Sequence, residues 1–408
     1  MDLPPLKYID SHGALVAWVE RLQHAEIIAI DTESDSFHSY KEKVCLIQMT
    51  ALGEDAIIDP LALENLEPLR PLLADPSRIK VFHDAGYDLL CLGRSFNFEI
   101  RGLFDTMLAS RLLGLKDFGL AAILQQRFGF SADKRLQRSD WARRPLTPQQ
   151  IEYARFDTHF LPRLVKLLRA ELKDVDRLNW ALEDFSRLPD IAARTPAPST
   201  AFDPDAWWRL RNLKSLSAVE KGRARELFYA REKLAEKLDR PPFKVFGDAV
   251  IIDLAADPPP GEEGLRPRSG LGPSAVKRFG PEIAEALKKA EPVKGNPPRG
   301  SGRRRRSGRF LDPLIKQRYE GLRILRKELA QELGVDPEVL LSNATLEDLS
   351  RNAPQETTQL RQYEQIDGWR LPLLGERIIG TLAAIPAEEP KPTTNDRRQK
   401  AAKSAVSQ

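Results

Sequence analysis

Cysteine is scarce in this chain of 408 residues, which contains only Cys45 and Cys91. Both lie among apolar residues, so we expect buried, reduced thiols rather than a disulfide framework or a cysteine zinc site. The first ten residues, MDLPPLKYID, contain no apolar signal-peptide core, and no apolar run reaches the length that crosses a bilayer. These absences predict a cytoplasmic protein with no membrane partner.

Neither sign of charge dominates, because 63 Lys and Arg oppose 59 Asp and Glu and leave a formal net charge of +4. This balance alone does not indicate a nucleic-acid partner, so the distribution of charge along the chain is more informative. Hydrophobic residues make up 41% and charged residues 30% of the chain, which is usual for a globular protein. The length is sufficient for two or three domains with their own cores.

Composition divides the chain into a domain at residues 1–190 and two helical domains at residues 205–291 and 310–386. Proline-rich residues 191–204 are expected to form a linker. Residues 292–309 are expected to form a second linker, with one lysine, six arginines and no acidic residue. Residues 387–408 are poor in apolar side chains and are expected to form a disordered tail.

Apolar and β-branched runs in the N-terminal domain predict five strands, at residues 27–33, 44–50, 56–59, 79–82 and 103–105. Short connections separate the first three, so we expect them to pair as a meander. Helices are expected at residues 11–24, 64–73, 83–92 and 106–113. One long helix is expected at residues 147–174, with Thr147 as its N-cap and Pro148 as its first residue. This order predicts an α/β domain with a mixed sheet flanked by helices.

The first predicted strand, IIAIDTE, ends in two acidic residues, Asp31 and Glu33. Since side chains alternate along a strand, both carboxylates are expected on one face. Adjacent carboxylates repel each other unless a cation lies between them, and hard oxygen ligands suit Mg²⁺ or Mn²⁺. Such a motif taken alone is more often a solvated strand end, so its interpretation depends on the rest of the chain.

Further acidic residues lie after the later strands and on the long helix. Asp88 is one helical turn beyond the fourth strand, and Asp84 is a competing candidate on the same helix face. Asp105 follows the fifth strand, where the simpler interpretation is an N-cap. Tyr153 and Asp157 share one helix face, although such a pair is usually a hydrogen-bonded surface pair. Several carboxylates converging beside a hydroxyl are the groups that two-metal phosphoryl chemistry requires.

Three motifs, DTE at 31–33, HDAGYD at 83–88 and YARFD at 153–157, resemble the exonuclease motifs of the DEDD superfamily, tyrosine subtype. The segments VCLIQMT at 44–50 and RSDWARRPLTPQQIEYARFDTHFLPRL at 138–164 resemble those of the ribonuclease D family. The resemblance covers roughly residues 5–190. One departure is Ser34, which occupies a position where the family often has an aromatic residue, and this difference could alter how a terminal base packs.

The two helical domains resemble HRDC domains, through ELFYAREKLAEKLDRPPFKVFGDAVIIDLA in the first and GWRLPLLGERIIGTL in the second. Three aromatic residues of the first domain are expected to pack in its interior: Trp207, Trp208 and Phe228. Basic side chains near them and in the second linker are candidate nucleic-acid contacts, namely Arg209, Arg211, Lys214, Arg303, Arg304, Arg305 and Arg306. A solvated helix face or a solubilising spacer explains these charges equally well.

The resemblance implies a metal-dependent 3′→5′ exoribonuclease that trims structured RNA, such as tRNA precursors, and releases nucleoside 5′-monophosphates. It implies two divalent ions, Mg²⁺ or Mn²⁺, of which the first is held by Asp31, Glu33 and Asp157. Asp31 would also bind the second ion, with Asp88 supporting it, and Tyr153 would hydrogen-bond the attacking water. The expected partner is RNA with a single-stranded 3′ end, and no protein partner is implied.

Two alternatives to this interpretation remain open. A DNA exonuclease would use the same carboxylates, because no residue in the sequence identifies a contact to a 2′-hydroxyl. The chain could also be an RNA-binding protein whose nuclease site has decayed. The complete set of four acids and one tyrosine argues against this second alternative.

Overall fold

The computed structural model of the chain describes residues 3–131, 134–195, 202–261, 264–293, 295 and 312–385. Contacts between residues divide the chain into two units, residues 1–109 with 117–306 and residues 110–116 with 307–408. Arg303, Arg304, Arg305 and Arg306 and the tail expected at 387–408 lie outside the described residues.

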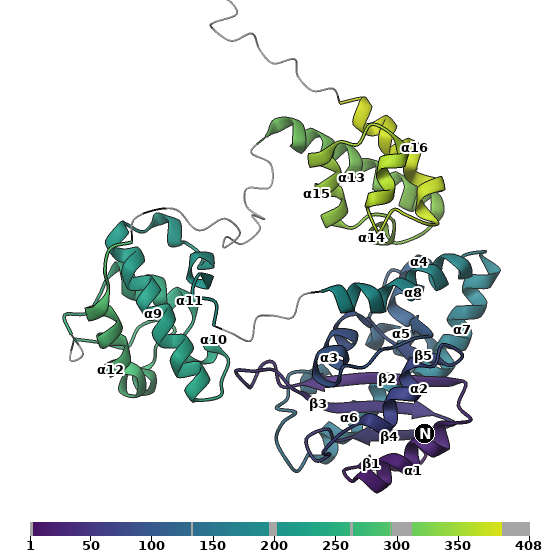
Figure 1. Cartoon of the computed structure of the whole chain (residues 1–408), viewed down its shortest axis with the longest axis horizontal. Helices are drawn as coiled ribbons and strands as arrows, with labels where there is room; N and C mark the ends of the chain where they lie inside the picture. The colour runs from purple at the N-terminus through teal and green to yellow at the C-terminus, as the bar shows by residue number, and fades with distance from the viewer. Residues whose placement is uncertain are drawn as a thin grey trace, which may run out of the picture. The chain divides into compact units, whose positions relative to one another are not determined.

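A six-stranded mixed sheet forms the centre of the N-terminal domain (Figure 1), in the order β1-β4-β3-β2-β5-β6. The strands are β1 (Leu6–Ile9), β2 (Ile27–Ser34), β3 (Val44–Ala51), β4 (Glu54–Ile58), β5 (Ile79–Phe82) and β6 (Leu103–Asp105). Strands β2, β3 and β4 are antiparallel neighbours, which confirms the predicted meander. Strand β1 was not predicted; it lies at the sheet edge beside β4 and buries only Ile9, so its sequence pattern is weak.

The helices of this domain are α1 (His12–Leu22), α2 (Arg70–Ala74), α3 (Gly86–Phe96), α4 (Thr106–Leu112), α5 (Leu120–Phe128), α6 (Pro148–His159), α7 (Leu161–Asp174) and α8 (Leu178–Arg194). Two 3-10 turns accompany them, η1 (Glu67–Leu69) and η2 (Lys134–Leu136). Helix α6 packs across β2, β3 and β4, and α7 packs across β2, β3 and β5. Because α8 continues to Arg194, the linker predicted at 191–204 begins inside a helix.

The single helix predicted over residues 147–174 is wrong, because the structure forms two helices, α6 and α7, that meet at Phe160. Pro162 lies at the start of α7 and has no N–H group to donate into a continuous helix, which explains the break. The predicted start is confirmed. The Thr147 hydroxyl accepts a hydrogen bond from the Gln150 backbone N–H, and the Gln150 side chain accepts one from the Thr147 backbone N–H.

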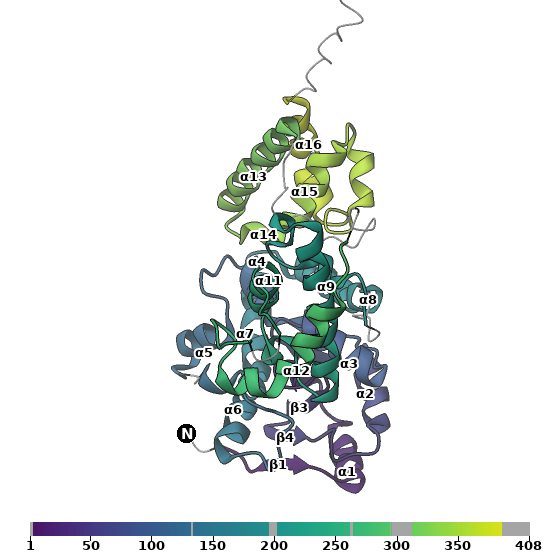
Figure 2. The same cartoon turned by 90° about the vertical axis from the view of Figure 1, so that its left-hand side faces the viewer.

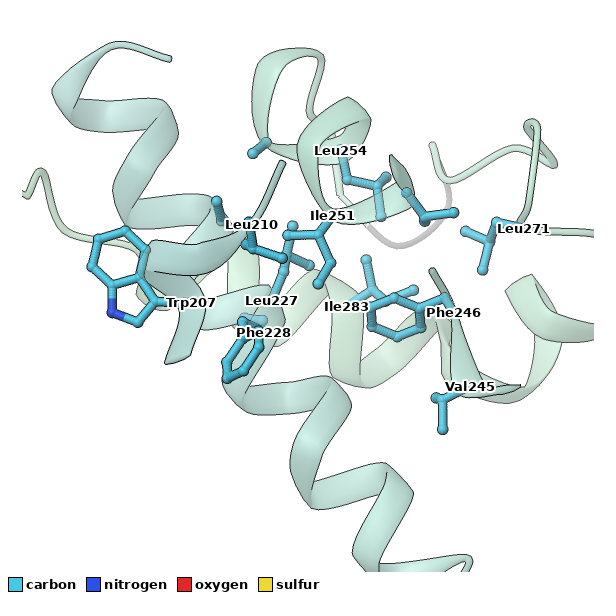
Figure 3. Close-up of a cluster of buried hydrophobic side chains, with 14 of the residues drawn as sticks. Trp207, Leu210, Leu227, Phe228, Val245, Phe246, Ile251, Leu254, Leu271 and Ile283 are labelled. Atoms are coloured by element: carbon cyan, nitrogen blue, oxygen red, sulfur yellow. The ribbon is translucent and has the colours of Figure 1, made fainter. Parts of the chain in front are cut away.

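The first helical domain surrounds one hydrophobic core (Figure 3). Its elements are η3 (Ala206–Arg209), η4 (Leu213–Ser215), α9 (Ala218–Lys237), α10 (Pro242–Val245), α11 (Asp248–Ala256) and α12 (Pro273–Lys289). The helix predicted from Ser217 to Leu238 is confirmed as α9, which Ser217 caps. Trp207 and Phe228 are buried as expected, and Trp208 stacks on Trp207 with ring centroids 4.0 Å apart.

The second helical domain contains α13 (Pro313–Leu333), α14 (Pro337–Leu340), α15 (Asn343–Asn352), η5 (Thr357–Gln362) and α16 (Arg370–Ala383). Helix α13 contacts α14, α15 and α16 (Figure 2), and these elements bury leucines and isoleucines between them. Across the part of the chain that the structure describes, no helix has both the length and the apolar character of a membrane span.

Candidate active site

Three carboxylates converge where α6 crosses the centre of the sheet. Asp31 and Glu33 lie on β2, between β3 and β5, and Asp157 lies on α6. One carboxylate oxygen from each of these residues lies within 4.8 Å of the other two. Since a hard divalent cation takes several oxygen ligands at about 2.0–2.6 Å, three oxygens this close fit one such ion.

Asp88 lies beside this cluster in the first turn of α3 and is buried. The Thr32 hydroxyl, between the two acids of β2, donates a hydrogen bond of 2.6 Å to Asp88 Oδ1. Thr32 was not predicted as a site residue, because a threonine between two acids has no distinctive pattern. Its hydroxyl fixes the Asp88 carboxylate next to the strand that carries Asp31 and Glu33.

The structure separates the two candidates in the second motif. Helix α3 begins at Gly86, so Asp84 precedes the helix, and the prediction that both residues share a helix face is wrong. Asp84 is exposed and has a φ of 66°, which is an uncommon conformation for a residue other than glycine. The buried residue that faces β2 is therefore Asp88.

Asp105 holds the turn that carries the second motif. Its Oδ1 accepts hydrogen bonds from the backbone N–H groups of Met107 and Leu108, which confirms the predicted N-cap of α4. The same carboxylate accepts from the backbone N–H groups of Asp84 and Ala85, at 3.2 and 2.8 Å. Asp105 thus links the starts of α3 and α4, and Asp88 lies on the first of these helices.

Tyr153 is half-buried on α6, and its ring lies 5.9 Å from that of the buried Trp141. The i, i+4 spacing from Tyr153 to Asp157 is intact because both residues lie within α6. Gln48 lies directly opposite Asp31 in the β2–β3 pair and is fully buried. Among the described residues, neither polar atom of its side chain has a hydrogen-bond partner, which is unusual for a buried amide and fits a position beside an ion site.

Burial and mutual repulsion disfavour charge on all four acids. Burial, together with the negative charge of Asp88, raises the pKa of Asp157 to about 7. Burial also raises the pKa of Asp88 to about 7, despite the hydrogen bond from Thr32. The pKa values of Asp31 and Glu33 are raised well above their usual range by burial and by the neighbouring carboxylates. A divalent cation would remove this repulsion, so the cluster is suited to binding one.

We expect the stability of the metal-free protein to fall as pH rises from about 4 to 7. A carboxyl group titrates near 3.9 when unfolded, whereas the pKa of Asp157 is about 7 in the fold. The folded protein therefore binds more protons across this interval, and deprotonation destabilises it.

The measurement is the melting temperature in EDTA as a function of pH, which should fall less steeply in Asp157→Asn than in the unmodified protein. Asp174→Asn, an exposed control with the same charge change, should follow the unmodified protein. Equal slopes of melting temperature against pH for Asp157→Asn and the unmodified protein would contradict this expectation.

Three of the candidate nucleic-acid contacts lie within the described residues. Arg209, Arg211 and Lys214 are exposed on the first helical domain. Arg209 forms an ion pair with Asp203, so part of its charge is neutralised locally. The structure thus leaves these residues accessible to a polyanion.

Comparison with known proteins identifies the family. A family model described as a 3′-5′ exonuclease matches residues 6–173, and an HRDC domain model matches residues 220–287 and 316–382. Ribonuclease D of Granulibacter bethesdensis is 30% identical over 368 residues, which cover 90% of this chain and 89% of that protein. The chain belongs to the ribonuclease D family. It is a 3′→5′ exoribonuclease with two HRDC domains, as the sequence motifs implied.

Solved structures share the ribonuclease D fold. The crystal structure of Escherichia coli RNase D matches with a TM-score of 0.66 and 24% identity, and covers 95% of this chain and 100% of that chain. The catalytic core of RRP6 from Trypanosoma brucei matches with a TM-score of 0.60 and 28% identity, over 70% of this chain and 79% of that chain. The predicted fold class, an α/β nuclease domain followed by two all-α domains, is confirmed.

Proposed function

We propose that this exoribonuclease removes nucleoside 5′-monophosphates from the single-stranded 3′ ends of structured RNA, with tRNA precursors as a natural substrate. The observation that supports the proposal most directly is the convergence of oxygens from Asp31, Glu33 and Asp157 within 4.8 Å. Action in the cytoplasm, expected from the sequence, stays a prediction.

We assign each side chain of the site a role. Asp31, Glu33 and Asp157 would hold one divalent ion, and Asp31 with Asp88 would hold a second, with Mg²⁺ or Mn²⁺ as the candidates. When bound, such ions make the attacking water more acidic and neutralise charge on the leaving oxygen. Tyr153 would hydrogen-bond the attacking water and orient it. A phenol usually titrates near ~10, so at neutral pH this group would orient the water rather than deprotonate it.

The proposed activity is tested with 5′-labelled RNA and DNA oligonucleotides of the same sequence, each incubated with Mg²⁺, Mn²⁺ or EDTA. We expect stepwise shortening of the RNA from its 3′ end with either ion and none in EDTA. Faster shortening of DNA than of RNA would favour the DNA exonuclease alternative. No shortening of either strand with either ion would favour a decayed site.

We expect digestion to stop where the substrate becomes double-stranded. The terminal phosphodiester has to reach a half-buried cluster between β2, α3 and α6, and a paired end reaches it only after unpairing. The measurement compares an RNA duplex that has a single-stranded 3′ overhang with the same duplex made blunt. Equal rates on the two substrates would contradict the requirement for a single-stranded end.

Basic residues outside the nuclease domain are proposed to increase RNA affinity without taking part in the chemistry. The logarithm of the RNA-binding constant should fall as the logarithm of the salt concentration rises. Replacing Arg209, Arg211 and Lys214 with alanine should make this slope less steep by about 0.7 per lost phosphate contact. Replacing Arg303, Arg304, Arg305 and Arg306 with serine should have a similar effect. A matched control changes three exposed basic residues of α7 to alanine: Lys166, Arg169 and Lys173. If all the proteins have the same slope on one tRNA precursor, the proposed contacts are wrong.

A further inference from the structure

Helix α6 carries Tyr153 and Asp157, and its apolar contact with the sheet is small. Ala154 packs with residues of β3 and β4 in a small core cluster, against which Ile151 and Tyr153 lie partly buried. The buried residues of α6 are Gln150, Ala154 and Thr158. The next helix, α7, buries an apolar stripe of Leu161, Leu164, Val165, Leu168 and Leu172. So small an apolar contact defines the position of a helix along a sheet only in part, because it offers little shape to match. Polar contacts therefore contribute to the position of α6.

Those contacts converge on Asp55, a buried residue of β4. Its Oδ2 accepts a hydrogen bond of 2.6 Å from Arg155 Nε, and its carboxylate lies 2.9 Å from His159 Nδ1. Asp55 Oδ1 accepts a hydrogen bond of 2.9 Å from the Thr50 hydroxyl, and that hydroxyl lies 2.8 Å from the Thr158 hydroxyl. Three residues within about one turn of α6 are thus tied to one carboxylate, directly or through Thr50.

The segment that leads into α6 is fixed by a second buried acid, Asp59, four residues further along the chain. Arg144 forms two hydrogen bonds with this carboxylate, Nε to Oδ2 at 2.6 Å and Nη2 to Oδ1 at 2.7 Å. Arg144 also donates to the carbonyl oxygens of Cys45 and Trp141. The Tyr8 hydroxyl donates to Asp59 Oδ2 at 2.6 Å. A paired arginine and carboxylate of this geometry is a directional contact, so it fixes orientation as well as proximity.

The charges on both acids are maintained inside the protein. Burial alone would raise the pKa of Asp55, but the hydrogen bonds from His159 and Arg155 outweigh it and lower the pKa. The pKa of Asp59 is likewise lowered, because the hydrogen bonds from Arg144 and Tyr8 outweigh its burial. This behaviour is opposite to that of the four acids of the active site. The carboxylates of Asp55 and Asp59 are therefore already neutralised by partners within the chain.

We propose that Asp55 and Asp59 are positioning residues, which hold α6 on the sheet at the place where Tyr153 and Asp157 face Asp31 and Glu33. Asp55 acts on the helix itself through Arg155, His159 and Thr158, and Asp59 acts on its entry through Arg144. The inference rests on the proposed roles of Tyr153 and Asp157. It assigns a residue of β4 and one directly after that strand, both outside the acidic cluster, to the geometry of the reaction.

The test uses Asp55→Asn and Thr50→Val in the full-length protein. A displacement of about 1 Å at a reacting group can reduce a rate by about 10²-fold, so kcat for Asp55→Asn should fall ~10–10²-fold with KM changed less than about twofold. Thr50→Val removes one hydroxyl and no charge, so it should lower kcat by a smaller factor, again with little change in KM. Rates are measured well below the melting temperature of each variant, which separates misplacement from unfolding.

Arg78→Gln is a matched control for lost stability. Arg78 pairs with Asp75 at 2.8 Å and donates to the carbonyl oxygens of Leu22 and Ala25, away from α6. This variant should melt at a lower temperature and retain its kcat. Amide exchange in the metal-free protein adds a readout independent of activity, since Asp55→Asn should speed exchange in α6 and leave α7 unchanged.

A double-mutant cycle distinguishes positioning from a general loss of stability. If Asp55 acts by placing α6, the effect of Tyr153→Phe on kcat should shrink in the Asp55→Asn background. The proposal would be overturned if the effects of Asp55→Asn and Tyr153→Phe on kcat simply multiply in the double variant. It would also be overturned if kcat is unchanged in both Asp55→Asn and Thr50→Val. If Asp55→Asn does not fold, Thr50→Val alone decides the question. Full activity of Asp157→Asn would instead reject the proposed site, whatever the Asp55→Asn and Thr50→Val variants show.

Discussion

The Asp157→Asn variant is expected to hydrolyse RNA at least about 10³-fold more slowly than the unmodified protein, a loss typical of removing a central catalytic group. The substitution keeps the shape of the side chain but removes one of the three oxygen anions that lie within 4.8 Å of one another. Asp31→Asn should have an equal effect, because Asp31 faces the same point from β2. Both rates are measured under single-turnover conditions with saturating Mg²⁺ or Mn²⁺.

The matched control for this experiment is Glu152→Gln, which makes the same chemical change on the exposed face of α6. This variant should retain the rate of the unmodified protein. The Asp157→Asn protein should also melt at a temperature no lower than that of the unmodified metal-free protein above pH 7, because it contains one fewer buried like charge. Near-normal turnover by either aspartate variant would show that the site has been assigned wrongly.

Tyr153→Phe is expected to have the second largest effect, a fall in kcat of about 10²-fold, within the range for a positioned proton-transfer group. The phenylalanine ring can keep the contact with Trp141, whose ring centroid lies 5.9 Å from that of Tyr153. The decrease in kcat therefore measures the contribution of the hydroxyl. Binding of divalent ions should be nearly unchanged, which titration calorimetry with Mn²⁺ can measure.

Tyr229→Phe is a suitable control for the loss of a phenol hydroxyl. Tyr229 lies in the first HRDC domain and donates a hydrogen bond to the Pro204 carbonyl oxygen at 2.8 Å. Its replacement should leave kcat unchanged. A single-turnover rate for Tyr153→Phe equal to that of the unmodified protein would rule out an action of this hydroxyl on the attacking water.

Features that depend on neighbouring residues were predictable from the sequence. Strand β2 was recognisable because an unbroken apolar run precedes Asp31, and the cap of α6 because Thr147 directly precedes Pro148. The helical spacing from Tyr153 to Asp157 likewise needs only one periodic element. These patterns are local, so a single sequence displays them directly.

Features that depend on distant partners were not predictable in this way. Asp55 and His159 are separated by 104 positions, and no periodicity connects them. The placement of Asp84 outside α3 depends on hydrogen bonds from its backbone and that of Ala85 to Asp105. The division between α6 and α7 was a different kind of error, because Pro162 is visible in the sequence and proline inside a helical pattern favours a break.

The break at Phe160 has a mechanical consequence for the nuclease domain. A continuous helix from Pro148 to Asp174 would be about 40 Å long. In such a helix, a tilt of the leucine-rich C-terminal half would also displace Asp157. Because the helix is divided at Phe160, we expect small shifts of α7 against the sheet to be taken up between the two helices. Substitutions in the leucine-rich stripe of α7 can therefore accumulate with little effect on the distance between Asp157 and Asp31.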